Sequence, residues 1–265
     1  MVGNLAVDRV SGGPPRAGGG VYYAARAAAH IGADLVVVTR CAPADRAVAL
    51  EPLEAFGLPV ISVDAAETTA FSFHYEDEHR VMSVDAVGDP WTADDVRGWA
   101  AAALDGVEWV QIAGLLRSHF PREVVAELAR GGRRLLLDAQ GSLRCAAVGP
   151  LRRDGEVDRE MLRHIAVLKL NEDEATILAG GLEPERLRAL GVDETLLTLG
   201  SRGALVVTDG DVAEVPARPA AAAADPTGAG DSFSLVYLDG RARGLEPRAA
   251  AERASAAVAE LLGGR

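Results

Sequence analysis

Residues 225–231 read DPTGAGD, and the apolar stretch SFSLVYL follows at once. Gly228 and Gly230 tolerate positive φ, and consecutive amides in such a turn can point into one concavity that binds an anion. A helix that begins near Gly228 or Ala229 leaves its first amides unpaired and directs a partial positive charge to the same point. Phosphate is the usual ligand of such a site, so the motif predicts phosphate binding.

Asp231 is the unexpected residue of this motif, because a carboxylate repels phosphate. Its position is explained if it accepts the proton of a hydroxyl group that attacks the phosphate. An Asp-Pro turn, with Asp231 as a helix-start carboxylate, explains the same residues without any chemistry. A GxGD pattern alone favours this second explanation, so the rest of the chain must decide.

Composition narrows the class of protein. The chain has 265 residues, 49% of them hydrophobic and 25% charged, with a formal net charge of −12. This length allows one or two domains, and an acidic chain without a basic stripe argues against nucleic acids and anionic membranes as partners. No apolar run is long enough for a membrane span, and no secretion signal precedes the first strand. Two isolated cysteines, Cys41 and Cys145, make neither a disulfide framework nor a zinc site, so we expect a cytoplasmic protein.

Short apolar runs alternate with helical patterns along most of the chain. The predicted strands cover residues 1–7, 34–40, 59–63, 109–114, 133–139, 166–171, 194–200, 203–210 and 212–217. The predicted helices cover residues 20–32, 44–57, 91–104, 120–132, 171–181, 230–244 and 246–264. This alternation predicts an α/β fold with a doubly wound, mostly parallel sheet, in which ligands bind at the carboxyl ends of the strands.

Residues 68–88 depart from this alternation. Two runs with a period of two residues flank the polar turn EDEH at 76–79, which is typical of a β-hairpin over about residues 69–84. We expect this hairpin to project from the main sheet. The acids and histidines at its tip are more typical of a solvated turn than of a metal site.

Several features now stand in one order along the chain. They are Asp8 at the end of a strand, the cluster Gly18-Gly19-Gly20 before a helix, the projecting hairpin, NEDE at 171–174, TLGSRGA at 198–204 and DPTGAGD at 225–231. In this order they resemble the ribokinase-like (PfkB) family of carbohydrate and nucleoside kinases, over almost the whole chain. The resemblance implies a single ribokinase-like domain over residues 1–265 that phosphorylates a small-molecule hydroxyl with ATP and Mg²⁺.

The resemblance also implies roles for matching positions on the phosphate side. Asp231 matches the catalytic base, and Gly228, Ala229 and Gly230 match the anion hole that stabilises the transferring phosphoryl group. Asn171 and Glu174 match an NxxE motif that helps to place Mg²⁺ through water. A helix start capped by Asn171 explains the same two residues, and both interpretations can hold together.

The nucleotide side is matched by Thr198, Gly200 and Gly203, although an ordinary turn would explain these three residues equally well. Ser255 matches a polar position near adenine. This side of the resemblance therefore depends more on the order of the motifs than on any one residue.

Acceptor binding is matched by Asp8, Gly18 and Gly19. DAQGSLR at 138–144 resembles the inositol kinase branch of the family, with Gln140 and Arg144 at a strand end; a plain turn with a surface arginine is the alternative. Lys169, the single lysine, either reaches a phosphate or pairs with a nearby acid. Only RVSGGPPRA lies between Asp8 and the glycine cluster, where many members have lid strands, so we expect the hairpin at 69–84 to form the lid alone.

Three functional classes remain after this comparison. The leading one is a kinase acting on a polyol such as myo-inositol, ahead of a sugar or nucleoside. A catalytically silent member that senses a ligand is disfavoured because the motif residues are all present. An NAD-dependent oxidoreductase is disfavoured because no GxGxxG follows the first strand. The resemblance leaves both a monomer and a homodimer open.

Overall fold

The computed structural model describes residues 1–76, 79–219 and 226–263. Asp77 and Glu78 of the predicted hairpin turn lie outside the described residues, as do the alanine run at 220–224 and Asp225 of the DPTGAGD motif. No helix within the described ranges is long and apolar enough to cross a membrane.

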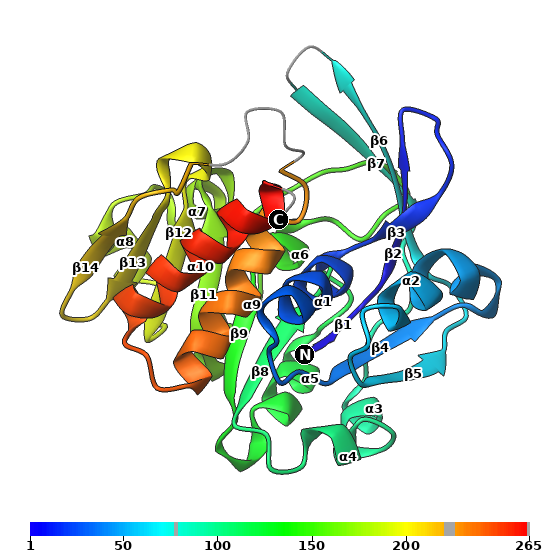
Figure 1. The fold of residues 1–265 in the computed structure, drawn as a ribbon, viewed down its shortest axis with the longest axis horizontal. Helices are drawn as coiled ribbons and strands as arrows, with labels where there is room; N and C mark the ends of the chain where they lie inside the picture. The colour runs from blue at the N-terminus through cyan, green and yellow to red at the C-terminus, as the bar shows by residue number, and fades with distance from the viewer. Residues whose placement is uncertain (77–78, 220–225, 264–265) are drawn as a thin grey trace.

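The main sheet has nine strands among the described residues, in the order β14-β13-β12-β11-β9-β8-β1-β4-β5 (Figure 1). Neighbouring strands are parallel except in the pairs β12–β13 and β13–β14. The strands are β1 Val2–Gly3, β4 Val37–Cys41, β5 Val60–Asp64, β8 Trp109–Ala113, β9 Arg134–Asp138, β11 Ile165–Asn171, β12 Glu194–Thr198, β13 Ala204–Thr208 and β14 Val212–Val215. The predicted doubly wound, mostly parallel sheet is confirmed.

Helices cover both faces of this sheet. The helices are α1 Gly20–Ile31, α2 Glu51–Glu54, α3 Ala93–Arg97, α4 Ala101–Leu104, α5 Arg122–Leu128, α6 Gln140–Leu143, α7 Glu172–Ala179, α8 Pro184–Arg188, α9 Ala229–Ala242 and α10 Pro247–Leu262. Short 3₁₀ turns lie at Pro43–Asp45, Arg130–Gly132, Arg159–His164 and Gly200–Arg202, and Arg46–Leu50 is a π-helical turn.

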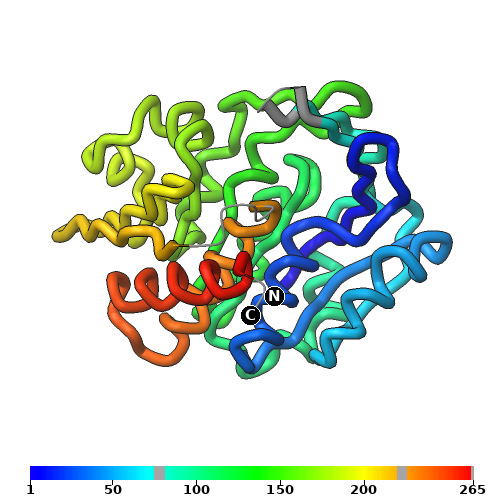
Figure 2. The backbone as a smooth tube through the Cα atoms, turned by 45° about the horizontal axis from the view of Figure 1, so that its top comes forward, coloured from blue at the N-terminus to red at the C-terminus, as the bar shows by residue number. Residues whose placement is uncertain are grey.

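Successive side chains along the strands point to opposite faces of the main sheet, and each face has its own hydrophobic core. Leu136 of β9 packs with α1, α9 and α10, whereas its neighbours Leu135 and Leu137 pack with α3–α5, α7 and α8. Because both faces are buried, these strands read as continuous apolar runs. Figure 2 shows the first third of the chain, in blue and cyan, and the last third, in yellow to red, on opposite sides of the green central strands.

The predicted helix at 91–104 is broken in two. Thr92 and Asp95 form a reciprocal capping box at the start of α3. Gly98 then leaves helical geometry, with φ −94° and ψ −109°, and α4 begins only at Ala101. A Cβ at Gly98 would lie 2.8 Å from the Asp94 carbonyl oxygen, so this turn depends on glycine.

A second, smaller sheet has the order β10-β7-β6-β2-β3. Its strands are β2 Ala6–Val10, β3 Arg16–Gly18, β6 Thr69–Glu76, β7 His79–Ala86 and β10 Gly149–Pro150. The predicted hairpin is present as β6–β7 and projects from the main sheet (Figure 1). The expectation that it stands alone is wrong, because the chain from Ala6 to Gly18 folds back as β2–β3 and β2 pairs in parallel with β6.

The first predicted strand is divided between the two sheets at Asn4. Its buried side chain donates to the Asp89 carbonyl oxygen at 3.0 Å and accepts from Trp91 Nε1 at 3.0 Å. These bonds tie the side chain of Asn4 to residues 89–91 at the point where the backbone crosses from β1 to β2. A purely apolar residue would have continued the strand pattern but could not have satisfied both groups.

We predict that Asn4→Leu lowers the free energy of unfolding by about 1–3 kcal/mol, because the buried Trp91 N–H loses its acceptor. Urea denaturation measures this change. In a Trp91→Phe background the same substitution should cost less, since that donor is already absent. An equal cost in both backgrounds would contradict the importance of this hydrogen bond.

Candidate active site

The register of the main sheet places polar residues at one edge. In the β9–β11 pair Asp138 lies opposite Lys169, and in the β11–β12 pair Asn171 lies opposite Thr198. All four are at or near the carboxyl ends of parallel strands, the edge at which such sheets bind ligands. The register therefore brings together residues that are up to 60 positions apart in the sequence.

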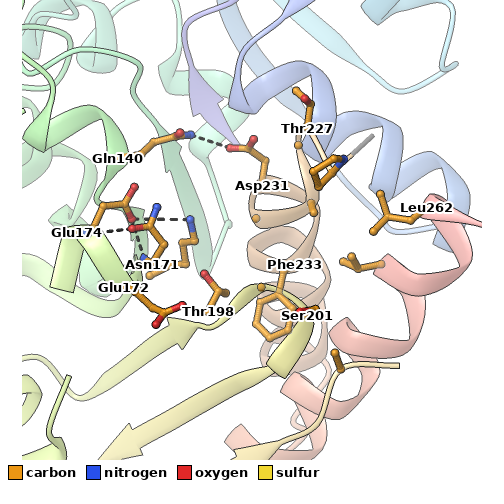
Figure 3. A pocket seen from close by; sticks show the side chains of 18 of the residues that line it. Gln140, Asn171, Glu172, Glu174, Thr198, Ser201, Thr227, Asp231, Phe233 and Leu262 are labelled. Atoms are coloured by element: carbon orange, nitrogen blue, oxygen red, sulfur yellow. Dashed lines mark hydrogen bonds and ion pairs between the residues drawn. The ribbon is translucent and has the colours of Figure 1, made fainter. Parts of the chain in front are cut away.

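A cavity of about 1240 Å³ opens at this edge (Figure 3). Of the residues predicted to have functional roles, those lining it are Gln140, Arg144, Asn171, Glu174, Thr198, Gly200, Gly203, Gly228, Ala229, Gly230, Asp231 and Ser255. Asp8, Gly18 and Gly19 are not among the lining residues. The cavity thus gathers most, but not all, of the predicted site.

The glycine turn forms the N-terminus of α9 as predicted. Gly228 is the N-cap residue and has φ 80°, and a Cβ there would collide with the Tyr23 ring. The amide of Ala229 donates to the Pro226 carbonyl oxygen at 3.0 Å. No backbone carbonyl of the described residues accepts from the amides of Gly230 and Asp231, so these amides remain at the helix start for an anion.

Asp231 stands in the first turn of α9, facing the strand ends. Its Oδ1 accepts a hydrogen bond from Gln140 Nε2 at 3.0 Å (Figure 3). A Cβ on Gly20 would lie 2.8 Å from the same oxygen, so glycine at the start of α1 leaves room for the carboxylate. Burial, and then the charge of Asp138, raise the pKa of Asp231 to about 6, against the opposing effect of Lys169 and Arg144.

Lys169 is buried beneath the glycine turn between two acids. Its Nζ lies 3.1 Å from Asp138 Oδ2 and 4.0 Å from Glu174 Oε2. Burial alone would lower the pKa of Lys169, but the nearby carboxylates of Asp138, Glu174 and Asp231 outweigh it and the net shift is upward. The side chain is therefore a fixed cation in the site.

Asn171 and Glu174 form the helix cap that the sequence allowed. Asn171 Oδ1 accepts from the Glu174 amide at 2.9 Å, and Glu174 Oε2 accepts from the Asn171 amide at 2.8 Å. Glu174 is only 3% exposed, and burial raises its pKa although Lys169 opposes this. One carboxylate oxygen is thus already occupied by the cap.

This donor set fits Mg²⁺ held through water rather than in a protein cage. No group of three or more His, Cys, Asp or Glu side chains with metal-binding geometry occurs in the part of the chain that the structure describes. Mg²⁺ usually keeps several waters and binds through one or two carboxylates together with substrate phosphates. Glu174 can supply such an outer contact through its remaining oxygen.

The residues predicted on the nucleotide side line the cavity and also stabilise the fold around it. Thr198 Oγ1 donates to the Leu170 carbonyl oxygen at 3.2 Å, and Ser255 Oγ donates to the Pro216 carbonyl oxygen at 3.0 Å. Gly200 and Gly203 have φ 58° and 107°, and a Cβ at Gly203 would collide with the Val215 carbonyl oxygen. These four residues shape the cavity wall, and both hydroxyl hydrogens are engaged with the backbone.

The residues predicted on the acceptor side fall into two groups. Asp8 is buried on β2, and a Cβ on Gly18 would collide with its carboxylate. Gln140 begins α6, and Arg144 follows that helix with its Cζ 5.8 Å from the centre of the Phe71 ring in the small sheet. The buried Nε of Arg144 has no hydrogen-bond partner among the described residues, which leaves it able to bind a ligand.

Three contributing residues, Asp138, Met82 and Arg153, have no role that the sequence predicted. Of the two roles predicted for Lys169, the structure shows the pairing with a nearby acid, since Lys169 and Asp138 form the ion pair at the base of the site; Met82 and Arg153 line the cavity. The occurrence of a single lysine in an arginine-rich chain was the one signal for this pair. Met82 lies on β7, so the small sheet contributes to the cavity wall, which no local pattern indicates.

The chain matches a known protein family over most of its length. A family model described as "pfkB family carbohydrate kinase" matches residues 7–263. The 2-dehydro-3-deoxygluconokinase of Thermoproteus tenax is 35% identical over 110 residues, which cover 38% of this chain and 32% of that protein. The match to this curated relative therefore spans only about a third of its length.

Two solved structures are similar over nearly the whole chain. One is a pyrophosphate-dependent kinase of the ribokinase family complexed with a pyrophosphate analogue and myo-inositol; it is 26% identical, with a TM-score of 0.84, and the alignment covers 98% of this chain and 93% of that one. The other is a pyrophosphate-dependent myo-inositol-1 kinase converted by mutation into a myo-inositol-3 kinase; it is 25% identical, with a TM-score of 0.83 and coverage of 99% and 92%.

We predict that Gly228→Ala weakens pyrophosphate binding at least about tenfold and destabilises the fold by about 1–3 kcal/mol. The added Cβ must displace Tyr23 and imposes positive φ on a residue that resists it. Titration calorimetry and thermal unfolding measure the two effects. Gly210→Ala is the control, because no described atom lies within 4 Å of its Cβ position. Unchanged pyrophosphate affinity in Gly228→Ala would contradict the anion-binding role of the turn.

Proposed function

Because the chain belongs to the pfkB family of carbohydrate kinases, we propose that it transfers a phosphoryl group from ATP to a hydroxyl of a small polyol, with myo-inositol as the acceptor. The observation that carries this proposal is the position of Asp231, a carboxylate with a raised pKa at the anion-binding end of α9. A base and a phosphate site side by side in one cavity are what phosphoryl transfer to an alcohol requires.

The proposed reaction uses Asp231 as the general base. The acceptor oxygen forms a bond to the transferred phosphorus as the bond to the leaving phosphate oxygen breaks, and the hydroxyl proton passes to Asp231. Gln140 holds the receiving carboxylate through its 3.0 Å hydrogen bond. A pKa of about 6 keeps Asp231 ionised at neutral pH yet makes it a better proton acceptor than an ordinary aspartate.

The phosphates are bound by fixed positive groups in this proposal. The amides at the start of α9 face the transferred phosphoryl group, and Lys169 lies directly behind them. A bound Mg²⁺ would neutralise charge on the donor phosphates, with Asn171 and Glu174 as its outer contacts. These groups stabilise charge that spreads over the phosphoryl oxygens during transfer.

ATP is proposed as the donor because the cavity continues past the phosphate site along an apolar wall. Phe233 of α9 and Val258, Ala259 and Leu262 of α10 line this extension, and Ser201 lies nearby (Figure 3). A nucleotide base requires such a wall, whereas pyrophosphate does not. Pyrophosphate is the second candidate, because the two similar solved structures are of pyrophosphate-dependent kinases.

Myo-inositol is proposed as the acceptor on chemical grounds and by similarity. A cyclitol presents hydroxyls around a saturated ring, and the carboxylate of Asp8, the amide of Gln140 and the guanidinium of Arg144 can bind such groups from several directions. The solved structure with 26% identity contains myo-inositol. The sequence match to 2-dehydro-3-deoxygluconokinase makes an acidic sugar, paired with Arg144, the alternative acceptor.

We further propose that the chain forms one kinase domain and that the small sheet is its lid. Phe71 and Phe73 of β6 are buried on one face of the hairpin, whereas Tyr75 lies in the part whose side chains are not described. Met82 extends from β7 to the cavity. Closure of the small sheet would exclude water and so limit transfer of phosphate to water.

The decisive experiment detects phosphorylated product by mass spectrometry for each pair of donor and acceptor. The donors are ATP and pyrophosphate; the acceptors are inositol isomers, ribose, fructose, 2-dehydro-3-deoxygluconate, adenosine and cytidine. We predict the highest kcat/KM for ATP with myo-inositol. A tenfold preference for another acceptor class would reject the acceptor, a preference for pyrophosphate would reject the donor, and no product from any pair would favour a silent, ligand-binding protein.

We predict that Asp231→Asn lowers kcat by about 10²–10⁴-fold, since asparagine keeps the shape but cannot take the proton. Wild-type kcat should fall about tenfold per pH unit below pH 6, because protonation removes the base. We call this fall the acid limb of the kcat profile, and it should be absent from the residual activity of the variant. Binding of the donor, measured by calorimetry, serves as the control and should change little. Retention of more than about a third of wild-type kcat would exclude Asp231 as the base.

A further inference from the structure

Asp138 is a buried carboxylate for which the proposed reaction has no role so far. It is the last residue of β9 and is only 2% exposed. Burying an ion pair is costly, and a well-packed apolar pair would stabilise a fold at least as well. A buried carboxylate beside the reaction centre therefore requires an explanation beyond packing.

The carboxylate of Asp138 contacts two different parts of the site. Oδ1 accepts from the backbone amide of Gln140 at 3.1 Å, and the side chain of Gln140 donates to Asp231 Oδ1 at 3.0 Å. Lys169 Nζ also donates to Oδ1, at 3.3 Å, and lies 3.1 Å from Oδ2. One carboxylate thus fixes both the residue that orients the proposed base and the ammonium group behind the glycine turn.

The position of Lys169 depends on this contact. Its Nζ would be 3.0 Å from a Cβ on Gly230, so the ammonium lies against the backbone that faces the phosphate. A lysine side chain is a flexible stem with a compact charge, and it needs partners to stay in one place. Glu174, at 4.0 Å, is a weaker anchor than Asp138.

We propose that Asp138 is a positioning residue for phosphoryl transfer, which holds Gln140 against Asp231 and Lys169 behind the glycine turn. This inference rests on the proposed kinase function. Asp138 touches neither substrate in this arrangement; it acts only through the two residues that it holds. Its removal should therefore affect the rate of transfer more than the binding of either substrate.

Asp138 also affects the charge state of the base. The charged groups that face Asp231 are Asp138 of β9, Lys169 of β11, Arg144 after α6 and Glu174 of α7. In Asp138→Asn one negative charge is lost, and Lys169 is left free to approach Asp231. Both changes favour the ionised form of Asp231, so the acid limb of the kcat profile should move to lower pH.

The first test is Asp138→Asn, with kcat and KM measured over a range of pH. We expect kcat to fall by about 10–100-fold, as is usual when a residue that orients a functional group is lost. KM for either substrate should change by less than about threefold, and the acid limb should move to lower pH. Unchanged kcat together with an unmoved acid limb would overturn the proposal.

Glu194→Gln is the matched control. Glu194 is also a buried, paired acid, but it begins β12 at the opposite end of the same sheet, where it accepts hydrogen bonds from Tyr237 and Arg241. This variant should lower the melting temperature without moving the acid limb. If both variants lost kcat equally with unmoved acid limbs, Asp138 would have only a structural role and the proposal would fail.

Gln140→Leu tests the same inference without altering a buried charge, and it serves if Asp138→Asn does not fold. Loss of the hydrogen bond to the ionised carboxylate should raise the pKa of Asp231, so the acid limb should move to higher pH, opposite to Asp138→Asn. An acid limb at the wild-type pH would overturn the proposal, because Gln140 would then have no effect on Asp231. Wild-type enzyme inactive with every donor and acceptor would instead reject the proposed function itself, so the two failures are distinguishable.

Discussion

The ion pair between Asp138 and Lys169 is the contact on which the arrangement of the site depends. It joins the carboxyl ends of β9 and β11, and its geometry follows from the parallel register that sets the two residues opposite each other. The pair is buried beneath the start of α9, so the glycine turn rests on a fixed positive charge. A shift of one residue in this register would turn the two side chains to opposite faces of the sheet and break the pair.

The site combines charges that would repel one another in isolation. Asp138, Glu174 and Asp231 are three acids in a small volume, balanced by Lys169 and by the half-buried Arg144. This balance leaves the pKa of Asp231 raised to about 6, while Lys169 remains a cation. An acidic protein can therefore present a local surface suited to an anion, because the groups at the start of α9 are backbone amides and one ammonium.

The small sheet depends on a division of the N-terminal segment. Asn4 allows the backbone to leave the main sheet after β1 and to enter the small sheet as β2. That crossing places Asp8 beside β6 and brings Gly20 next to Asp231. A few residues at the start of the chain thus link the proposed lid to the proposed base.

The sequence alone determined the elements whose causes are local. Alternating apolar runs predicted the doubly wound parallel sheet, the DPTGAGD motif predicted a glycine turn at the start of α9, and NEDE predicted the cap of α7. Turn chemistry and caps depend on residues within one or two turns of each other, so they can be read in order along the chain. The family resemblance then assigned roles to these and to further positions, which the structure gathers around one cavity except for Asp8, Gly18 and Gly19.

Tertiary structure decided whatever depends on pairing between distant segments. The β2–β3 hairpin exists because β6 offers β2 an edge to pair with, although SGGPP at 11–15 by itself resembles a loop. Asp138 and Lys169 become partners only through strand register, and the hydroxyl of Ser255 is engaged by the Pro216 carbonyl only because α10 packs beside β14. Such contacts join residues far apart in sequence, and no local pattern encodes which of many possible pairings the folded chain adopts.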